Sequence, residues 1–303
     1  MNAMPLHSMI RLAAILITSV FVVATNRNET AWLSMVYILG FGHYFMSLLY
    51  SKKQVKQVLE RPYSRWSLVG LFLLGFFTYR YQFPLVIYFG IHHAFNEVYL
   101  LNRTIRPQVQ DQIKALRTAG VLLNFLVYLF LLRGYPELQL MNAKIILFFV
   151  SFSYVFFFYI LFKLRTDLKV LELIDNCALE VLSIFFLIGS FFFSIRFTDI
   201  VCFHFFFWML YPVPKLIRTE RLALYRYLGL TILTLVPAFL LSPYGLVSYG
   251  LQGSFFQNQF ILWSFIHITV SFALSDSHPA WITRWFKPRE VYVLEPREGK
   301  ITV

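Results

Sequence analysis

The chain has little charge and almost no cysteine for its length. Only 14% of its 303 residues are charged, and its two cysteines, Cys177 and Cys202, match no metal-binding or redox spacing. It lacks a Walker A loop, the G-x-G-x-x-G and G-x-S-x-G motifs, and the histidine boxes of membrane desaturases. These absences argue against cysteine metal sites, nucleotide binding and serine hydrolysis. The last apolar segment, 259–275, has no lysine for a retinal Schiff base, which argues against a rhodopsin.

Apolar and aromatic residues are present in large excess instead. The chain is 58% hydrophobic and 19% aromatic, and its 35 phenylalanines include runs such as 156–158 and 205–207. A water-soluble fold has too little interior to bury this much apolar surface, so we expect lipid as the solvent. The net charge of +12 is explained by basic residues in the connections that are expected to face the cytoplasm. We therefore expect no nucleic-acid partner.

Apolar stretches separated by charged or turn-forming residues predict about ten helices. The predicted segments are 9–24, 31–50, 66–79, 83–101, 118–133, 143–163, 171–195, 199–214, 227–241 and 259–275. Those meeting near 80–82 and 196–199 also fit re-entrant hairpins, which sets the range at eight to ten spans. The sequence therefore predicts an all-α fold, a polytopic transmembrane helix bundle forming one integral membrane domain over 1–303.

The basic residues predict the orientation of this bundle. Most of the 27 Lys and Arg residues fall in alternate connections or in a short basic tail at 276–303, and Arg11 is counted on the same side. The exceptions are Arg27, Arg80, Arg133, Lys144 and Arg196. Because cytoplasmic loops hold the excess of Lys and Arg, we expect both termini and the tail in the cytoplasm. The expected location is multi-pass in a membrane, the plasma (inner) membrane if the protein is bacterial.

Five of the 7 histidines lie within predicted helices, where ionisable side chains are costly and usually functional. They are His43, His92, His93, His204 and His267. At a rise of about 1.5 Å per residue, the side chains about 10 to 15 Å from the cytoplasmic helix ends are His43, His93, His204, His267 and Glu180. A shared depth predicts one buried site. The alternative for each histidine is a hydrogen bond to a neighbouring helix.

The densest motif is at 91–97, where His93 and Glu97 are one helical turn apart, as are His92 and Asn96. Adjacent histidines point about 100° apart, so one of them is expected to enter the site. We favour His93, because it shares a face with Glu97, and His92 stays open. Glu97 and Glu180 are the candidate catalytic or supporting carboxylates.

Neutral imidazoles beside a lipophilic cavity suit non-haem iron, so we predict Fe²⁺ held by His43, His93, His204 and His267. Haem b, held by two histidines from facing helices, is the less favoured cofactor.

Three histidine segments give the chain a resemblance to a known family. They are Gly42-His43, His93-Ala94-Phe95-Asn96-Glu97 and Phe203-His204-Phe205. In these segments and in length the chain resembles the Brp/Blh family of membrane enzymes, which cleave β-carotene with histidine-bound ferrous iron. The chain differs in having Tyr44 and Phe45 after His43, and Trp208 one turn after His204, so the resemblance needs a fourth ligand from His267.

These observations predict a metal-dependent membrane oxidoreductase or oxygenase that acts on a lipid, an isoprenoid or a carotenoid. The expected partners are membrane lipids and a lipophilic small-molecule substrate. The alternative is a transporter or a proton- or cation-conducting protein that uses the same His and Glu residues. A third possibility is a haem-b membrane protein or a lipid acyltransferase.

Overall fold

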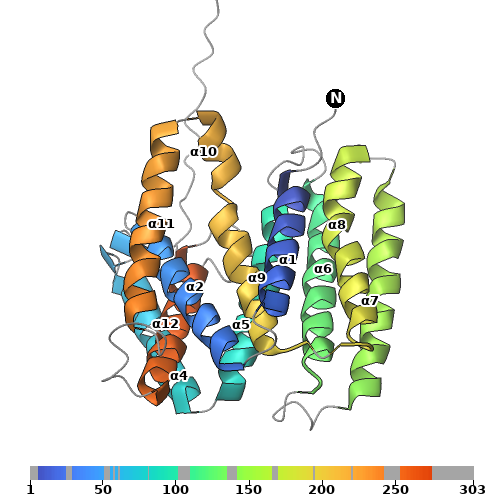
Figure 1. Ribbon diagram of the computed structural model, residues 1–303. Helices are drawn as coiled ribbons and strands as arrows, with labels where there is room; N and C mark the ends of the chain where they lie inside the picture. Colours follow the sequence, from blue (N-terminus) through green and yellow to red (C-terminus); the bar gives the residue numbers. More distant parts are fainter. Residues whose placement is uncertain are drawn as a thin grey trace, which may run out of the picture.

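The computed structural model describes residues 6–24, 29–50, 55–56, 59–60, 62–80, 82–101, 110–134, 142–165, 170–193, 195–219, 221–241 and 253–274. The predicted tail at 276–303 lies outside these residues. The described part is entirely helical (Figure 1). Its helices are α1 (Leu6–Ala24), α2 (Glu29–Tyr50), α4 (Pro62–Arg80), α5 (Gln82–Leu101), α6 (Gln110–Leu131), α7 (Ala143–Leu164), α8 (Val170–Gly189), α9 (Phe197–Leu210), α10 (Val213–Thr219), α11 (Arg221–Leu241) and α12 (Gly253–Leu274).

Nine of the ten predicted segments each correspond to one long helix among the described residues, and the boundaries differ where polar residues intervene. α6 begins at Gln110 and α11 at Arg221, both earlier than predicted, because charged residues extend these helices beyond their apolar stretch. The predicted segment 199–214 is instead divided into α9 and the short α10. Pro212 lies at this break, where its missing N–H cannot continue the helical hydrogen bonds.

Polar side chains define several helix ends. The Asn142 side chain accepts a hydrogen bond from the backbone N–H of Lys144 at 2.9 Å and so caps α7. The carboxylate of Asp199 accepts from the backbone N–H of Arg196 at 2.9 Å at the start of α9. α8 ends at Gly189 rather than at 195, and Arg133 donates to the Ser190 carbonyl at 2.6 Å. This bond links the ends of α6 and α8.

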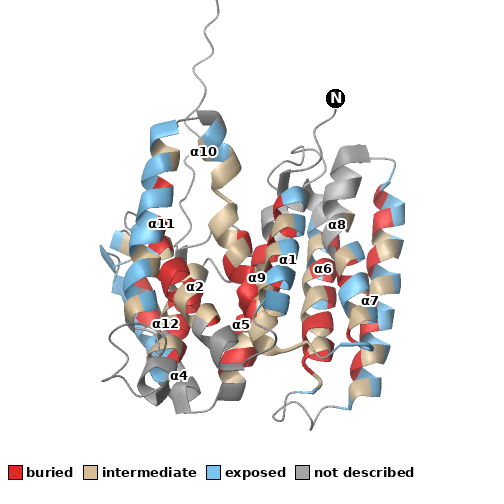
Figure 2. Cartoon of the chain, in the orientation of Figure 1, coloured by how far each residue is buried: buried red, intermediate tan, exposed pale blue. Residues whose placement is uncertain are grey.

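The helices pack into a bundle in which α2, α5, α9 and α12 occupy the region around the histidines. α2 packs against α9, α11 and α12, while α12 also contacts α4 and α5. On the other side α5 packs against α6, which contacts α7 and α8, and α1 lies against α8 and α9 (Figure 1). Buried residues concentrate on the inward faces of these helices, and exposed residues on the outward faces (Figure 2).

Outward faces of the bundle are apolar as well. On α7 the buried residues recur every three or four positions, from Ile146 to Leu164, which forms one inward stripe. The opposite side exposes large apolar residues, including Phe148, Phe152 and Val155, the last at 70%. An exposed surface of this kind is typical of contact with lipid or another protein.

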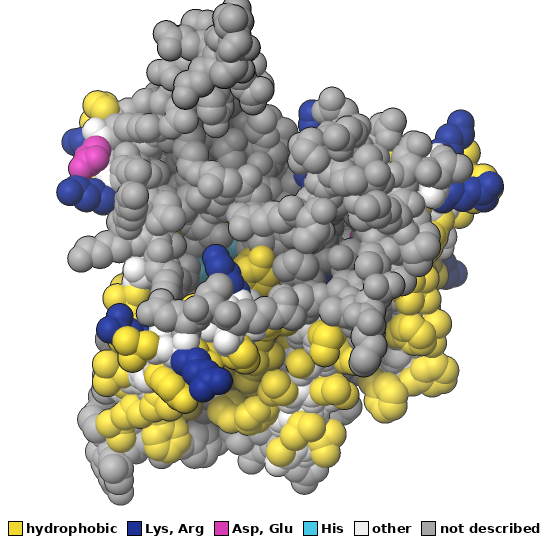
Figure 3. All heavy atoms as spheres, turned by 90° about the horizontal axis from the view of Figure 1, so that it is seen from above, with side chains coloured by type: hydrophobic (Ala, Val, Ile, Leu, Met, Phe, Trp, Pro, Cys, Tyr) yellow, Lys and Arg dark blue, Asp and Glu magenta, His cyan; other side chains and the backbone are white. Residues whose placement is uncertain are grey.

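Three helical stretches of the described residues are long and apolar enough to cross a membrane. They are Lys114–Leu131, Ala143–Leu164 and Phe197–Ile217. Shorter apolar helices are Met9–Ala24, Met35–Leu49 and Glu180–Gly189. The helical part of the fold prediction is therefore confirmed, and the membrane part is supported for these three helices. Seen from the end that carries α10, Lys and Arg side chains lie at several places on the surface, with hydrophobic side chains along one edge (Figure 3).

Candidate metal centre and adjoining pocket

The five helical histidines converge in the interior, although they come from four helices far apart in the chain. His43 is on α2, His92 and His93 are on α5, His204 is on α9 and His267 is on α12. Ring centroids of His204 lie 5.6 Å from His43, 5.3 Å from His92 and 5.5 Å from His93. His204 is therefore the centre of the cluster.

One group of possible ligands consists of His43, His204 and His267. One ring nitrogen from each lies within 4.8 Å of the other two, and all three residues are buried. The Nε2 atoms of His43 and His267 are 3.1 Å apart. Three buried imidazoles at this spacing can bind a divalent transition metal.

A second group consists of His93, Glu97 and His204, again with ligand atoms within 4.8 Å of one another. The Nδ1 atoms of His93 and His204 are 3.3 Å apart. The Oε1 atom of Glu97 and the Nε2 atom of His204 are buried and have no hydrogen-bond partner among the described residues. Two histidines with one carboxylate resemble the ligand set of non-haem ferrous oxygenases. All four predicted histidine ligands thus border the cluster, in two groups that share His204.

His92, which the sequence left open, also lies at the cluster. Its ring is 5.3 Å from His204 and 5.7 Å from His267, and the residue is buried. Its Nε2 lies 2.9 Å from the Asn96 side-chain nitrogen, as the one-turn spacing indicated. His92 belongs to neither possible ligand group, which leaves it a packing and hydrogen-bonding role beside them.

Arg11 is the site residue that the sequence analysis missed. It is fully buried, and its Nε donates to the Glu97 Oε2 at 2.8 Å while its Nη2 donates to the Glu97 carbonyl at 3.0 Å. Under the positive-inside rule, Arg11 was counted with the cytoplasmic basic residues. The available signal was an arginine inside an apolar segment, because such a residue almost always pairs with an acid. The ion pair holds Glu97 with one carboxylate oxygen free.

Glu180 lies apart from both possible ligand groups. Its Oε1 accepts a hydrogen bond from the Asn124 side chain at 3.2 Å, and its Oε2 is buried with no partner among the described residues. The Ser183 hydroxyl donates to the Glu180 carbonyl at 2.7 Å. Glu180 therefore belongs to a polar seam between α6 and α8, where a supporting role fits better than metal ligation.

Close helix contacts and aromatic side chains fix the histidines in place. A Cβ added at Gly40 would contact Phe260 and lie 2.9 Å from the Phe205 ring, so glycine permits α2 to approach α9 and α12. The Tyr44 hydroxyl shares a hydrogen bond with Ser264, and the Phe205 ring lies 5.2 Å from His43. Rigid packing of this kind keeps ligand side chains in one geometry.

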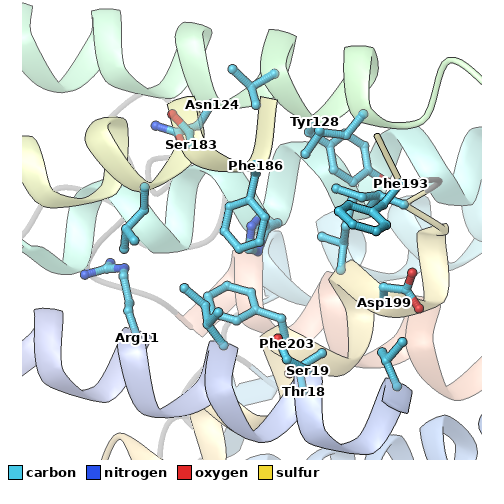
Figure 4. A pocket seen from close by; sticks show the side chains of 18 of the residues that line it. Arg11, Thr18, Ser19, Asn124, Tyr128, Ser183, Phe186, Phe193, Asp199 and Phe203 are labelled. Atoms are coloured by element: carbon cyan, nitrogen blue, oxygen red, sulfur yellow. The ribbon is translucent and has the colours of Figure 1, made fainter. Parts of the chain in front are cut away.

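A largely apolar pocket of about 480 Å³ adjoins the cluster. It lies between α1, α6, α8 and α9, and His93 contributes to its wall. Phe186 and Phe203 face each other across its middle, with Arg11, Asn124 and Ser183 toward one end and Phe193 and Asp199 toward the other (Figure 4). Its volume and lining are typical of a site for a lipophilic small molecule.

The cluster favours a bare ion over haem b. A porphyrin between His43 and His267, or between His93 and His204, would need each pair to move apart from its present separation of 3.1 or 3.3 Å. An ion, in contrast, needs only small shifts of buried ring nitrogens that already face one another. Imidazole and carboxylate ligands without cysteine suit iron and manganese, while zinc also accepts them.

Comparison of the chain with protein-family models, curated proteins and solved structures gives no match.

Proposed function

We propose that the protein is a multi-pass membrane enzyme that uses a histidine-bound metal ion, iron in the first instance, to oxidise a lipophilic substrate with dioxygen. The observation that carries the proposal is the convergence of five histidines from four helices beside an apolar pocket. Intramembrane ionisable residues are expensive, so a purely structural role is a poor reason to gather five of them.

The proposal places the ion at His93, Glu97 and His204. This group lies on the pocket side, because His93 lines the pocket and its ring is 6.1 Å from that of Phe203. His43 and His267 lie behind His204, where they orient it or complete the ligand set. Bound ferrous iron supplies dioxygen chemistry that no side chain can perform. The surrounding residues hold the substrate and exclude water.

The membrane part of the proposal rests on the apolar outward faces and on the three long apolar helices. The other helices become spans if tilt or local thinning of the bilayer accommodates their shorter apolar stretches. A lipophilic substrate then enters the pocket sideways, since Val23 and Phe186, which line it, are also exposed, at 76% and 37%. Carotenoids are one candidate substrate class, as the resemblance to the Brp/Blh family implies.

The deciding experiment is metal analysis of detergent-purified protein, with His204→Ala as the test and His278→Ala as the control. We expect about one iron per chain in the wild type and the control, and almost none in His204→Ala. An absorption spectrum without a haem band completes the result. A wild type that stays metal-free after anaerobic reconstitution with ferrous iron contradicts the proposal.

A second candidate function is proton or cation conduction. The observation in its favour is the chain of imidazoles in which His43 meets His267 and His93 meets His204 at hydrogen-bond distance. Such a chain can pass a proton between ring nitrogens. Vesicles containing metal-free protein test this candidate, because conduction that His204→Ala abolishes without any change in metal content assigns the histidines to transport.

A further inference from the structure

The pocket has a polar end and an apolar body. On α1 its lining runs from Arg11 to Val23, which is about 18 Å at 1.5 Å per residue. Apolar side chains, among them Ile15, Phe186 and Phe203, form most of this length. Arg11 and Asn124 lie together at one end (Figure 4). A long apolar molecule with one polar terminus matches this shape.

A hydrogen-bond donor is left over at the polar end. Arg11 uses Nε and Nη2 for Glu97, and its Nη1 is buried with no partner among the described residues. The Asn124 amide nitrogen is already used, since it donates to the Gly120 carbonyl and to Glu180. A buried guanidinium N–H without an acceptor is costly, and a ligand oxygen can satisfy it.

In the metal-free protein, the charges around Arg11 favour an uncharged oxygen. The Arg11 cation is matched by the Glu97 carboxylate at 2.8 Å, and the Glu180 carboxyl group lies 3.2 Å beyond Asn124. A carboxylate or phosphate ligand would add a further negative charge to a region of low dielectric that already holds two carboxyl groups. A hydroxyl or carbonyl oxygen accepts from Arg11 without this repulsion.

Toward the other end of the pocket, the described lining residues include no cationic side chain. Asp199 lies there, and its carboxylate accepts from the backbone N–H of Arg196. The Thr18 hydroxyl donates to the Ala14 carbonyl at 2.7 Å. A bound amphiphile is therefore expected to place its polar end on Arg11, the charged donor among the described lining residues.

We propose that the pocket binds an uncharged, long-chain amphiphile with its terminal hydroxyl or carbonyl oxygen on the free Nη1 of Arg11 and its chain along Phe186 and Phe203. This inference rests on the proposed function, because it treats the pocket beside the metal centre as the substrate site. Glu97 is both a proposed ligand of the ion and the partner of Arg11. The ion therefore lies close to the polar end of the pocket, and oxidation is expected near that end of the chain.

Photolabelling of the full-length protein in detergent tests the binding mode. The probe is a long-chain alcohol that carries a diazirine next to its hydroxyl end, and the labelled peptides are mapped by mass spectrometry. We expect the label on α1 near Arg11 and on α6 near Asn124. Label concentrated around Asp199 and Thr18 overturns the proposed orientation.

Competition on metal-free protein, with three unlabelled molecules of equal chain length, tests the end group. Cetyl alcohol should displace the probe at about tenfold lower concentration than hexadecane, as expected for one hydrogen bond to a charged donor. It should also displace the probe better than palmitate. Equal displacement by hexadecane, or stronger displacement by palmitate, overturns the inference.

Two variants test whether Arg11 causes the preference for cetyl alcohol over hexadecane. Arg11→Lys keeps a cation beside Glu97 but removes the guanidinium nitrogen Nη1. The preference for cetyl alcohol over hexadecane should therefore disappear. Ser19→Ala, in the same pocket but away from its polar end, should keep it. If Arg11→Lys does not fold, the labelling map of the wild type decides the question.

Iron content, measured on the same wild-type samples, separates this inference from the proposed function. Protein that cannot be loaded with iron but prefers the alcohol contradicts the oxidoreductase and leaves the amphiphile site standing. Protein that can be loaded with iron but shows no preference in its metal-free form contradicts the amphiphile site alone.

Discussion

His204 is the residue on which the proposed centre depends, because it belongs to both possible ligand groups. Of the remaining histidines, one lines the pocket and two contact each other away from it. His93 lines the pocket, whereas His43 and His267 contact each other on the far side of His204. The two sides can be separated by mutating one histidine on each.

We expect His93→Ala to abolish iron binding and His43→Ala to weaken it by about 10- to 100-fold, the usual loss for a residue that orients a ligand. The reason is that His93 and Glu97 hold the ion in the proposed geometry, while His43 supports His204. Titration of the metal-free variants with ferrous iron under anaerobic conditions measures both affinities. The reverse order places the ion among His43, His204 and His267 instead.

The Arg11–Glu97 pair makes a prediction about stability. Removing one partner leaves a buried charge uncompensated, so we expect Arg11→Met to lower the free energy of unfolding by about 3 to 5 kcal/mol. The double variant Arg11→Met, Glu97→Leu removes both charges and should recover most of that loss. Thermal unfolding in detergent measures the effect. A single variant as stable as the wild type shows that the pair is not buried in the protein.

At the scale of helices, glycines set how closely neighbours approach. A Cβ added at Gly90 on α5 would contact the Tyr128 ring on α6, with a second ring atom at 2.7 Å, and the Tyr128 hydroxyl donates to the Val86 carbonyl at 2.8 Å. That ring is fixed by its hydrogen bond and cannot move away freely. The α5–α6 contact holds the helix that carries His92, His93 and Glu97.

We expect Gly90→Ala to destabilise the protein by about 1 to 3 kcal/mol through overpacking. Gly70→Ala is the matched control, because no atom of the described residues lies within 4 Å of a Cβ at Gly70 in α4. Alanine there should be neutral or stabilise by up to about 1 kcal/mol, as helix propensity indicates. Unfolding temperatures of the two variants compare the effects. Equal stability of both would contradict the close α5–α6 approach.

At the scale of the whole molecule, the orientation of the bundle in the membrane is the main prediction that awaits a test. Arg133 and Arg196 lie near the end at which α8 connects to α9, and Lys163 and Lys215 lie toward the end that carries α10 (Figure 1). The positive-inside rule predicts that the end of the bundle carrying α10 faces the cytoplasm.

Single cysteines at exposed helix ends test this orientation. With Cys177 and Cys202 replaced by serine, a cysteine at Asn142 should react with a membrane-impermeant maleimide added to intact cells, and a cysteine at Arg165 should react only after lysis. Both positions are exposed in the structure, at opposite ends of α7. The opposite pattern inverts the topology, and equal labelling before lysis contradicts a membrane-spanning α7.

The helices were predictable because hydrophobic runs and the polar residues between them act locally. Each of the ten predicted segments matches helix among the described residues, one of them divided into α9 and α10. The errors fall at ends such as Gly189 and Pro212, where a tertiary contact of Arg133 or a proline decides. His43, His93, His204 and His267 were also identifiable, since an ionisable residue in an apolar helix stands out whatever the fold.

Four features required the tertiary structure. Only the tertiary packing that places α1 against α9 and α8 also brings Arg11 to Glu97 of α5, 86 residues away, and forms the pocket beside His93. Only the crossing of α5 and α9 decides that His93 approaches His204 and that Glu180 lies elsewhere. The sequence by itself determined which side chains are too costly to bury alone, because that cost depends on residue type and surroundings. Which partners meet them depends on helix rotation and crossing, which arise from many weak packing contacts along each interface.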